Sequence, residues 1–265
     1  LHLEAQRVGY PPVTSRPRIL IAEPLGFSPK AVAALSREAE VVLDVLAPGA
    51  LGGAMQSYDA VWIRLGHKVD LAALGAKRRC RVLATTVTGI DHVDVEACRA
   101  AGVRVVSLKG ETEFLKEVRA TAELTVGLAI ALMRQVPQAA ASVIKGEWAR
   151  DRFRGNELYK KTVGLIGVGR LGTLVAGYFR AFGCEVLGYD IRADIPDKVE
   201  RCESLVELLG KSDLVSVHVS YDASTHHLLG AQSFAAMRKS AFFINTSRGG
   251  VVDEAALLAA LESGK

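Results

Sequence analysis

The sequence is poor in cysteine and has no long apolar run, and each of these absences excludes a class of protein. Its four cysteines, among 265 residues, form no CxxC pair, and no histidine lies near them at metal-ligand spacing. This pattern excludes a disulfide-built scaffold and a zinc finger, so we expect reduced thiols, a cytoplasmic location and no bound metal. The longest apolar stretch, residues 124–133, is too short to span a bilayer, and we expect no membrane partner.

Neither sign of charge dominates. The 33 Lys and Arg residues against 29 Asp and Glu residues give a formal net charge of +4, so we expect no nucleic-acid partner. The densest basic run, residues 77–81, precedes an apolar segment, and we interpret it as a loop in solvent. With 49% hydrophobic and 23% charged residues, the chain has the composition of a folded globular protein of one large domain or two.

Short apolar runs alternate with helical patterns after a proline-punctuated segment, residues 1–16, which we expect to be a flexible arm. Because no tight hairpin signal joins the runs, the alternation predicts parallel strands connected by crossovers. The first set comprises expected strands at 18–22, 40–46, 60–64, 82–86 and 103–107, with helices from Ser28 and over 94–101.

A second set of the same kind follows a longer helix, expected over residues 120–134, that is apolar on most sides. Its expected strands are 162–167, 185–190, 213–219 and 241–246, and its expected helices are 171–182, 204–209 and 254–262, the last with Asp253 as N-cap. The sequence therefore predicts an α/β protein of two flavodoxin-like or Rossmann-like domains with parallel sheets, residues 17–111 and 112–265.

Three glycines, Gly167, Gly169 and Gly172, form a GxGxxG pattern where an expected strand turns into an expected helix. In this context the first glycine permits the tight turn, the second lets the backbone approach a pyrophosphate, and the third allows close helix packing. The phosphate charge would lie against the N–H groups of the helix N-terminus. The pattern predicts a dinucleotide site.

Asp190 lies eighteen residues after Gly172, at the end of the next expected strand. A carboxylate at this place can accept hydrogen bonds from both hydroxyls of an adenosine ribose and would repel a 2′-phosphate, so we expect NAD rather than NADP. Arg192 leaves NADP open as an alternative, although we interpret its side chain as a solvated loop arginine.

The expected strand 241–246 ends at a polar Thr-Ser-Arg-Gly-Gly turn before a capped helix. Ligands of open α/β sheets gather beyond the carboxyl ends of the strands, which puts Arg248 where a ligand is expected. The fork of an arginine suits a carboxylate. Helix capping by Arg248, or a pair with Asp253, is the alternative.

Three segments resemble the D-isomer-specific 2-hydroxyacid dehydrogenase family, in particular its phosphoglycerate dehydrogenase-like group. They are Thr88-Gly-Ile-Asp-His-Val-Asp94, the fingerprint from Gly167 to Asp190, and Asn245-Thr-Ser-Arg-Gly-Gly-Val-Val-Asp-Glu254. In addition, Ala120-Thr-Ala-Glu-Leu-Thr125 looks like the family's interdomain helix.

The resemblance implies an NAD-dependent oxidoreductase that interconverts a D-2-hydroxy acid and its 2-oxo acid by hydride transfer. It implies that residues 17–111 are a substrate-binding domain, that residues 112–265 are an NAD-binding Rossmann domain, and that the cleft between them holds the nicotinamide and the acid. It also implies a homodimer formed through the nucleotide domain.

The resemblance assigns roles to individual residues. Arg248 would be the catalytic residue, holding and polarising the carboxylate and carbonyl of the substrate, and the backbone amides of Thr88 and Gly89 would bind that carboxylate. The residues expected at the cofactor are Thr88, Gly167, Gly169, Arg170, Leu171, Gly172, Asp190, Val219, Thr246 and Ser247.

Some features depart from the family or stay open. The family's motif usually has Pro where this chain has Ser220, which leaves that backbone contact open. We interpret His218 as a packed strand-end histidine, and His226 and His227 as loop residues. The substrate stays open among phosphoglycerate, glycerate, lactate and larger branched hydroxy acids.

All six histidines precede Arg248, whereas the family's acid/base histidine and its carboxylate lie after the Arg-Gly-Gly segment. We therefore expect Lys265 to be a truncation point and the 265-residue chain alone to be inactive. The alternative is a non-catalytic NAD(H)-sensing regulator, similar to corepressors that resemble these dehydrogenases. A regulator of this kind would make no use of Arg248 or of the turn at Thr88 and Gly89.

Overall fold

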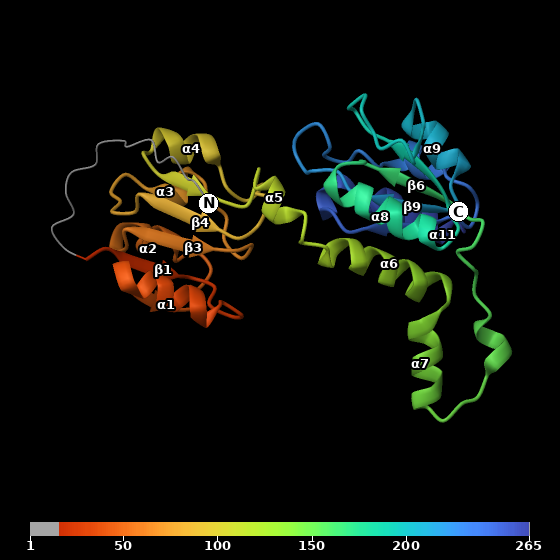
Figure 1. The fold of residues 1–265 in the computed structure, drawn as a ribbon, viewed down its shortest axis with the longest axis horizontal. Coiled ribbons are helices and arrows are strands. Elements are labelled where there is room, and N and C mark those ends of the chain that lie inside the picture. The colour runs from red at the N-terminus through yellow and green to blue at the C-terminus, as the bar shows by residue number, and fades with distance from the viewer. Residues whose placement is uncertain (1–15, 265) are drawn as a thin grey trace. The chain divides into compact units, whose positions relative to one another are not determined.

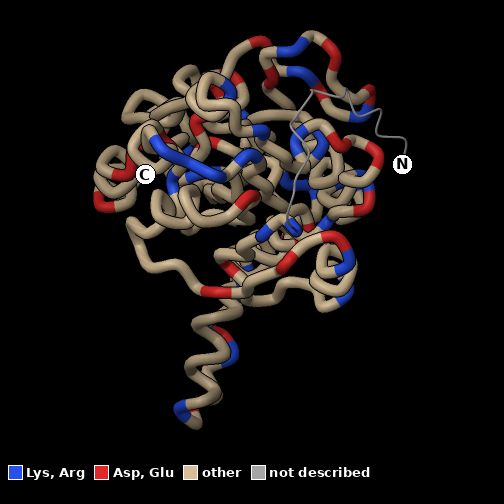
Figure 2. The backbone as a smooth tube through the Cα atoms, turned by 90° about the vertical axis from the view of Figure 1, so that its left-hand side faces the viewer, with Lys and Arg blue, Asp and Glu red and all other residues tan. Residues whose placement is uncertain are grey.

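A computed structural model describes residues 16–264 as two units, each built on a five-stranded parallel sheet (Figure 1). The first unit ends at Glu111, and the second begins at Thr112. The flexible arm expected at residues 1–16 lies, except for Arg16, outside the described residues. Basic and acidic residues alternate along the tube, so neither sign is confined to one stretch (Figure 2).

The first unit has the strand order β2-β1-β3-β4-β5, which is the flavodoxin-like arrangement. Its strands are β1 (Arg18–Ile21), β2 (Glu40–Leu43), β3 (Ala60–Ile63), β4 (Val82–Thr85) and β5 (Arg104–Val106). Its helices are α1 (Pro29–Glu38), α2 (Leu51–Ser57), α3 (Leu71–Leu74) and α4 (Val95–Ala100).

The second unit has the strand order β10-β9-β6-β7-β8, which is that of one half of a Rossmann sheet extended by two strands. Its strands are β6 (Thr162–Ile166), β7 (Glu185–Tyr189), β8 (Glu200–Arg201), β9 (Leu214–Val217) and β10 (Phe242–Asn245). Its helices are α5 (Thr112–Leu115), α6 (Ala120–Met133), α7 (Val136–Ile144), η1 (Arg150–Phe153), α8 (Arg170–Ala181), α9 (Leu205–Lys211), α10 (Ala231–Ala236), η2 (Gly249–Val251) and α11 (Glu254–Glu262).

The alternation of side chains along β6 divides the core of the second unit into two layers. Val163 and Leu165 pack with α6 and α8, where Phe179 is fully buried. Ile166 packs with α9, α10 and α11 on the other face. Because each face of the sheet is covered by helices, the residues of β6 and β9 are buried almost throughout.

These sheets confirm the expected fold class, and the expected strands all form, with shorter ends. The short helices α2, α3 and α10 were not expected, since four to seven residues give little periodicity. The apolar sides of the helix over 120–134 imply burial on several faces or packing against another subunit. In the described structure one face of α6 is buried, with Ala122, Ala129 and Met133, whereas Leu124, Leu128 and Leu132 are exposed.

Across residues 16–264, no single helix is long and apolar enough to cross a membrane. The segment 112–133 and α7 reach the required length and composition only as a pair that is bent by 63°.

Candidate functional site

The loop between β6 and α8 takes its shape from Gly167 and Gly172. Gly167 has a φ of 89°, and a Cβ there would come within 2.9 Å of the carbonyl carbon of His218 and 3.0 Å of Cγ1 of Val219. A Cβ on Gly172 would overlap the carbonyl oxygen of Gly167. These two glycines therefore let the first turn of α8 lie directly against the ends of β6 and β9.

Gly169 serves a different purpose from its two neighbours. It is the N-cap of α8, and no side chain caps the amides of that helix's first turn. A Cβ on Gly169 would have a single atom near it, Nη2 of Arg192 at 3.9 Å. The space in front of the helix N-terminus is therefore open, and its unpaired amides and positive end of the helix dipole fit the pyrophosphate of a dinucleotide.

Arg170 and Leu171 follow Gly169 and direct their side chains into the protein. Nη1 of Arg170 donates to the carbonyl oxygens of Leu115 and Val118, at 2.9 and 2.8 Å. Leu171 packs against the core of the second unit. Any contact of these two residues with a phosphate would therefore be made by their backbone amides.

Asp190 follows β7 and lies beside the glycine loop, where its carboxylate is surrounded by donors. Its Oδ2 accepts the amide of Val168 at 2.8 Å, and its Oδ1 accepts the amide of Arg192 at 2.9 Å. The guanidinium of Arg192 adds one bond to each oxygen, both at 3.1 Å. Arg192 is an exposed loop arginine, as interpreted from the sequence, but its side chain also pairs with Asp190.

Two opposing effects act on the pKa of Asp190. Burial would raise this pKa, but the hydrogen bonds from the side chain and amide of Arg192 and from the amide of Val168 outweigh it and hold the pKa below its usual range. Asp190 is therefore a carboxylate at neutral pH.

His218 lies after β9, on the side of the strand end next to the glycine loop. Its Nε2 contacts the hydroxyl of Ser216 at 2.9 Å, and its amide donates to the carbonyl of Ile166 at 2.7 Å. Burial lowers the pKa of His218 to about 4. His218 is therefore a neutral, packed residue at physiological pH, in line with its interpretation from the sequence.

The turn after β10 is organised by Asn245, which the sequence interpretation did not single out. Its Nδ2 donates to the carbonyl of Arg248 at 2.9 Å, and its Oδ1 accepts the amide and hydroxyl of Ser247 at 2.9 and 2.8 Å. The hydroxyl of Thr246 contacts that of the buried Thr125 on α6 at 2.9 Å. The backbone that carries Arg248 is thus held by its own neighbours in the chain.

Two further residues stabilise the segment around Arg248. Asp253 caps α11 by accepting the amide of Ala256 at 3.1 Å. The ring of Tyr221 lies against Gly250, where a Cβ would meet it at 2.7 Å, and its hydroxyl contacts Nδ1 of His226 at 3.0 Å. No motif pointed to Tyr221, because its contacts depend on how the loop after β9 folds back.

The sheet orders bring most of the expected cofactor residues of the second unit to one edge. Gly167, Asp190, Val219 and the turn at Thr246 follow β6, β7, β9 and β10, and these are neighbouring parallel strands. Thr88 and Gly89 belong to the first unit, in the turn between β4 and α4. Their expected contact with a substrate carboxylate stays a prediction.

The same edge of the first sheet carries a second organised loop. Glu23, after β1, accepts the amides of Arg64 and Gly66 at 2.7 and 3.3 Å. These bonds fix the loop that follows β3, in which His67 is buried. Among residues 16–264, no group of three or more His, Cys, Asp and Glu side chains is arranged to hold a metal ion.

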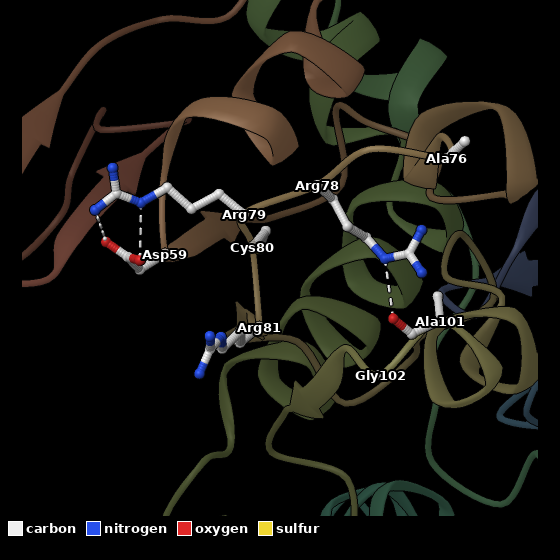
Figure 3. A pocket seen from close by; sticks show the side chains of 8 residues that line it. All are labelled: Asp59, Ala76, Arg78, Arg79, Cys80, Arg81, Ala101 and Gly102. Atoms are coloured by element: carbon white, nitrogen blue, oxygen red, sulfur yellow. Dashed lines mark hydrogen bonds and ion pairs between the residues drawn. The ribbon is translucent and has the colours of Figure 1, made fainter. Parts of the chain in front are cut away.

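A cavity of about 590 Å³ lies at the opposite, amino-terminal edge of the first sheet (Figure 3). The fork of Arg79 donates to Asp59 at 2.9 and 2.8 Å, and this pair lowers the pKa of Asp59. Arg78 donates to the carbonyls of Ala101 and Gly75, at the ends of α4 and α3. Residues 77–81 lie in a loop with Lys77, Arg79 and Arg81 exposed, as interpreted from the sequence, and the side chains of Arg78 and Arg79 in addition bind their own chain.

Comparison with known proteins gives consistent results. The model of the D-isomer specific 2-hydroxyacid dehydrogenase family, NAD binding domain, matches residues 126–265. A D-3-phosphoglycerate dehydrogenase of Methanocaldococcus jannaschii is 36% identical over 253 residues, which are 94% of this chain and 47% of the relative. A hydroxypyruvate reductase of Thermotoga maritima is 31% identical over 251 residues, 95% of this chain and 80% of the relative.

A solved structure of similar fold is a D-lactate dehydrogenase from Aquifex aeolicus complexed with NAD and lactic acid. It superposes with a TM-score of 0.80 at 28% identity, covering 94% of this chain and 74% of the other. The chain spans about half the length of the phosphoglycerate dehydrogenases that it matches.

The low pKa of His218 predicts a pH-dependent stability. Between pH 6.5 and about 4 the unfolded chain binds a proton at this residue and the folded chain does not, so folding weakens as the pH falls through this range. Lowering the pH from 7 to 5 should remove about 2 kcal/mol from this source. Urea unfolding of the wild type and of His218→Gln at both pH values tests this, and equal pH dependence of the two proteins would contradict it.

Proposed function

Since the chain belongs to the D-isomer-specific 2-hydroxyacid dehydrogenase family, we propose that it carries the dinucleotide site and the substrate-orienting arginine of an NAD-dependent oxidoreductase. The reaction would interconvert a small D-2-hydroxy acid and its 2-oxo acid. One observation supports this most. The N-terminus of α8 at Gly169 has no side-chain cap, and the carboxylate of Asp190, just after the neighbouring strand β7, lies next to it.

The residues of the second unit divide the binding of NAD among themselves. The backbone amides of Arg170, Leu171 and Gly172 bind the pyrophosphate, which Gly169 lets approach. Asp190 binds the adenosine ribose, while Val219, Thr246 and Ser247 line the remainder. When bound, the nicotinamide accepts or supplies the hydride.

Arg248 is the residue that we propose to act on the substrate. A guanidinium can hold a carboxylate by two parallel hydrogen bonds and polarise the neighbouring carbonyl. Asn245 gives the turn a fixed backbone, so that the arginine need not be ordered anew for each turnover. For Thr88 and Gly89 of the first unit, the proposed role is to bind a substrate carboxylate through their backbone amides.

The regulator alternative has less support. A protein that only senses NAD(H) needs the glycine loop and Asp190 but has no use for an arginine on a turn where Asn245 donates one hydrogen bond and accepts two. We therefore do not propose it. The four cysteines are unpaired buried thiols, which supports the proposal of a reducing, cytoplasmic environment.

We also propose that two copies of the chain associate through α6 and α7. Although α7 is rich in apolar residues, its one buried residue is Ser142. Ile144 and Trp148 are 86% and 88% exposed, and Leu124, Leu128 and Leu132 add an apolar row on α6. α7 extends away from the sheet of the second unit in Figure 1, and its residues 136–144 include no charged side chain. A self-complementary contact with a second copy would cover this surface.

Gly169→Ala tests the dinucleotide site without disturbing the fold. A methyl group at this position has room, but it stands where the pyrophosphate must approach, so NADH affinity should fall about tenfold or more, while thermal stability stays nearly unchanged. The matched control is Gly177→Ala on the same helix, which has open space around it and should bind NADH as the wild type does. Titration of NADH fluorescence measures both, and equal affinities would contradict the proposal.

Arg248→Ala tests the reaction in the natural protein that carries this sequence. Loss of the guanidinium should lower kcat/KM by about 100-fold or more for a 2-oxo acid, with NADH affinity within about threefold of wild type. Arg238→Ala is the control, because Arg238 pairs with Asp213 at 2.9 Å, near the amino ends of the strands. A panel of hydroxypyruvate, glyoxylate and pyruvate identifies the substrate class, and an unchanged kcat/KM would remove Arg248 from the mechanism.

Ile144→Asp combined with Trp148→Asp tests the association of two copies. Two charges on the exposed apolar surface should convert a dimer into a monomer, because their burial in an interface would be costly. Leu25→Asp, at a residue 87% exposed in the first unit, should leave the dimer intact. Sedimentation equilibrium gives the mass of each, and a monomeric wild type would refute the proposal.

A further inference from the structure

The carboxylate of Asp190 has its hydrogen-bonding capacity filled within the chain itself. An ionised carboxylate offers about four acceptor positions, two on each oxygen. Oδ2 accepts the amide of Val168 and Nη2 of Arg192, and Oδ1 accepts the amide and Nε of Arg192. The side chain of Asp190 is only 9% exposed, so little of it is left for another partner.

The four donors are of two kinds. The amides of Val168 and Arg192 belong to the backbone and stay with the loop. The guanidinium of Arg192 is a side chain, 50% exposed, that occupies one position on each oxygen. Those are also the two positions that the vicinal hydroxyls of a ribose would need. Binding of an adenosine ribose at Asp190 therefore requires the guanidinium of Arg192 to leave.

The backbone at Arg192 is fixed independently of its side chain. Arg201, on β8, donates from Nη1 to the carbonyl of Arg192 at 2.8 Å and from Nη2 to the carbonyl of Asp190 at 3.2 Å. Arg201 is thus a positioning residue for the loop after β7. The side chain of Arg192 can turn while the loop keeps its place, and the displaced guanidinium remains two residues from the carboxylate.

The displaced guanidinium would stand beside the ribose hydroxyls. Its Nη2 already donates to the carbonyl of Val168 at 3.0 Å, so it lies along the glycine loop. A 2′-phosphate on the ribose is a strong, bidentate partner for an arginine, and this attraction opposes the repulsion by Asp190. The nearby charges of Asp194 and Arg201 have opposite signs and offset each other. Attraction or repulsion of a 2′-phosphate therefore depends on Asp190 and Arg192.

We propose that Arg192 is a specificity-determining residue that competes with the ribose of NAD for Asp190 and, once displaced, binds the 2′-phosphate of NADP, so that the chain takes both dinucleotides. This inference rests on the proposed function, because it requires a dinucleotide at the glycine loop. It extends the expectation of NAD at this site, for which Arg192 left NADP open as an alternative.

The test compares NADH and NADPH binding to the wild type, to Arg192→Met and to a control, Arg180→Met. In Arg192→Met the competition is absent, so NADH should bind about two- to fivefold more tightly, the range for breaking one half-exposed ion pair. NADPH should bind about tenfold more weakly, because its phosphate has lost its partner while Asp190 remains. Arg180 contacts the carbonyl of Lys198 at 3.1 Å, away from Asp190, and Arg180→Met should change neither affinity.

Arg192→Lys is the second variant, which preserves the charge but cannot form the fork. Its affinity for NADPH should lie between those of the wild type and Arg192→Met, because the ammonium keeps the attraction to the phosphate but loses the paired hydrogen bonds of the fork. An affinity as low as that of Arg192→Met would show that the charge alone contributes nothing. Fluorescence titration gives the Kd values, and circular dichroism verifies that each variant is folded.

The outcomes distinguish a failure of the proposed function from a failure of the role proposed for Arg192. A wild type that binds neither dinucleotide would refute the proposed function, and this inference with it. A wild type that binds NADH but not NADPH, or an Arg192→Met variant with both affinities unchanged, would overturn the role of Arg192 and leave the proposed function standing.

Discussion

The close approach of α8 to the ends of β6 and β9 is the constraint on which the candidate site depends. It is possible only because Gly167 and Gly172 have no side chains, since a Cβ on either would collide with backbone. The approach brings the first amides of α8 to the edge where β7, β9 and β10 also end. Asp190, Val219 and the turn of Arg248 gather around this helix end because each lies just after one of those strands.

The N-terminus of α8, like that of α10, has a glycine as N-cap and no side-chain cap, and so it differs electrically from the helices that a side chain caps. Asp70, Asp94, Ser204 and Asp253 cap α3, α4, α9 and α11 with their side chains. These caps satisfy the amides that a helix leaves unpaired, and each adds about 1 kcal/mol of stability. At α8 a glycine stands in the capping position, so the second unit forgoes that stabilisation at the place where an anion can take it over.

The sequence was sufficient to predict the fold class and nine of the strands, because parallel strands need crossovers and short apolar runs alternate with helical patterns. It missed β8, since two residues show no periodicity. It also predicted the glycine loop, since the spacing of Gly167, Gly169 and Gly172 reflects local backbone geometry. It could not predict the partners of long side chains. Arg78 reaches the carbonyl of Ala101 and Arg192 folds back on Asp190, and both contacts depend on loop conformations that no periodicity records. The contacts of Asn245 could not be predicted for the same reason.

The turn after β10 is maintained by the side chains of both Asn245 and Arg248. Asn245 donates to the carbonyl of Arg248 and accepts the amide and hydroxyl of Ser247, while Nη1 of Arg248 donates to the carbonyl of Ser247 at 3.2 Å. A change at Arg248 would remove the last of these bonds and leave those that Asn245 accepts from Ser247. Loss of Asn245 would remove three hydrogen bonds of this turn at once, so the shape of the segment that presents Arg248 depends on a residue at the end of β10 itself.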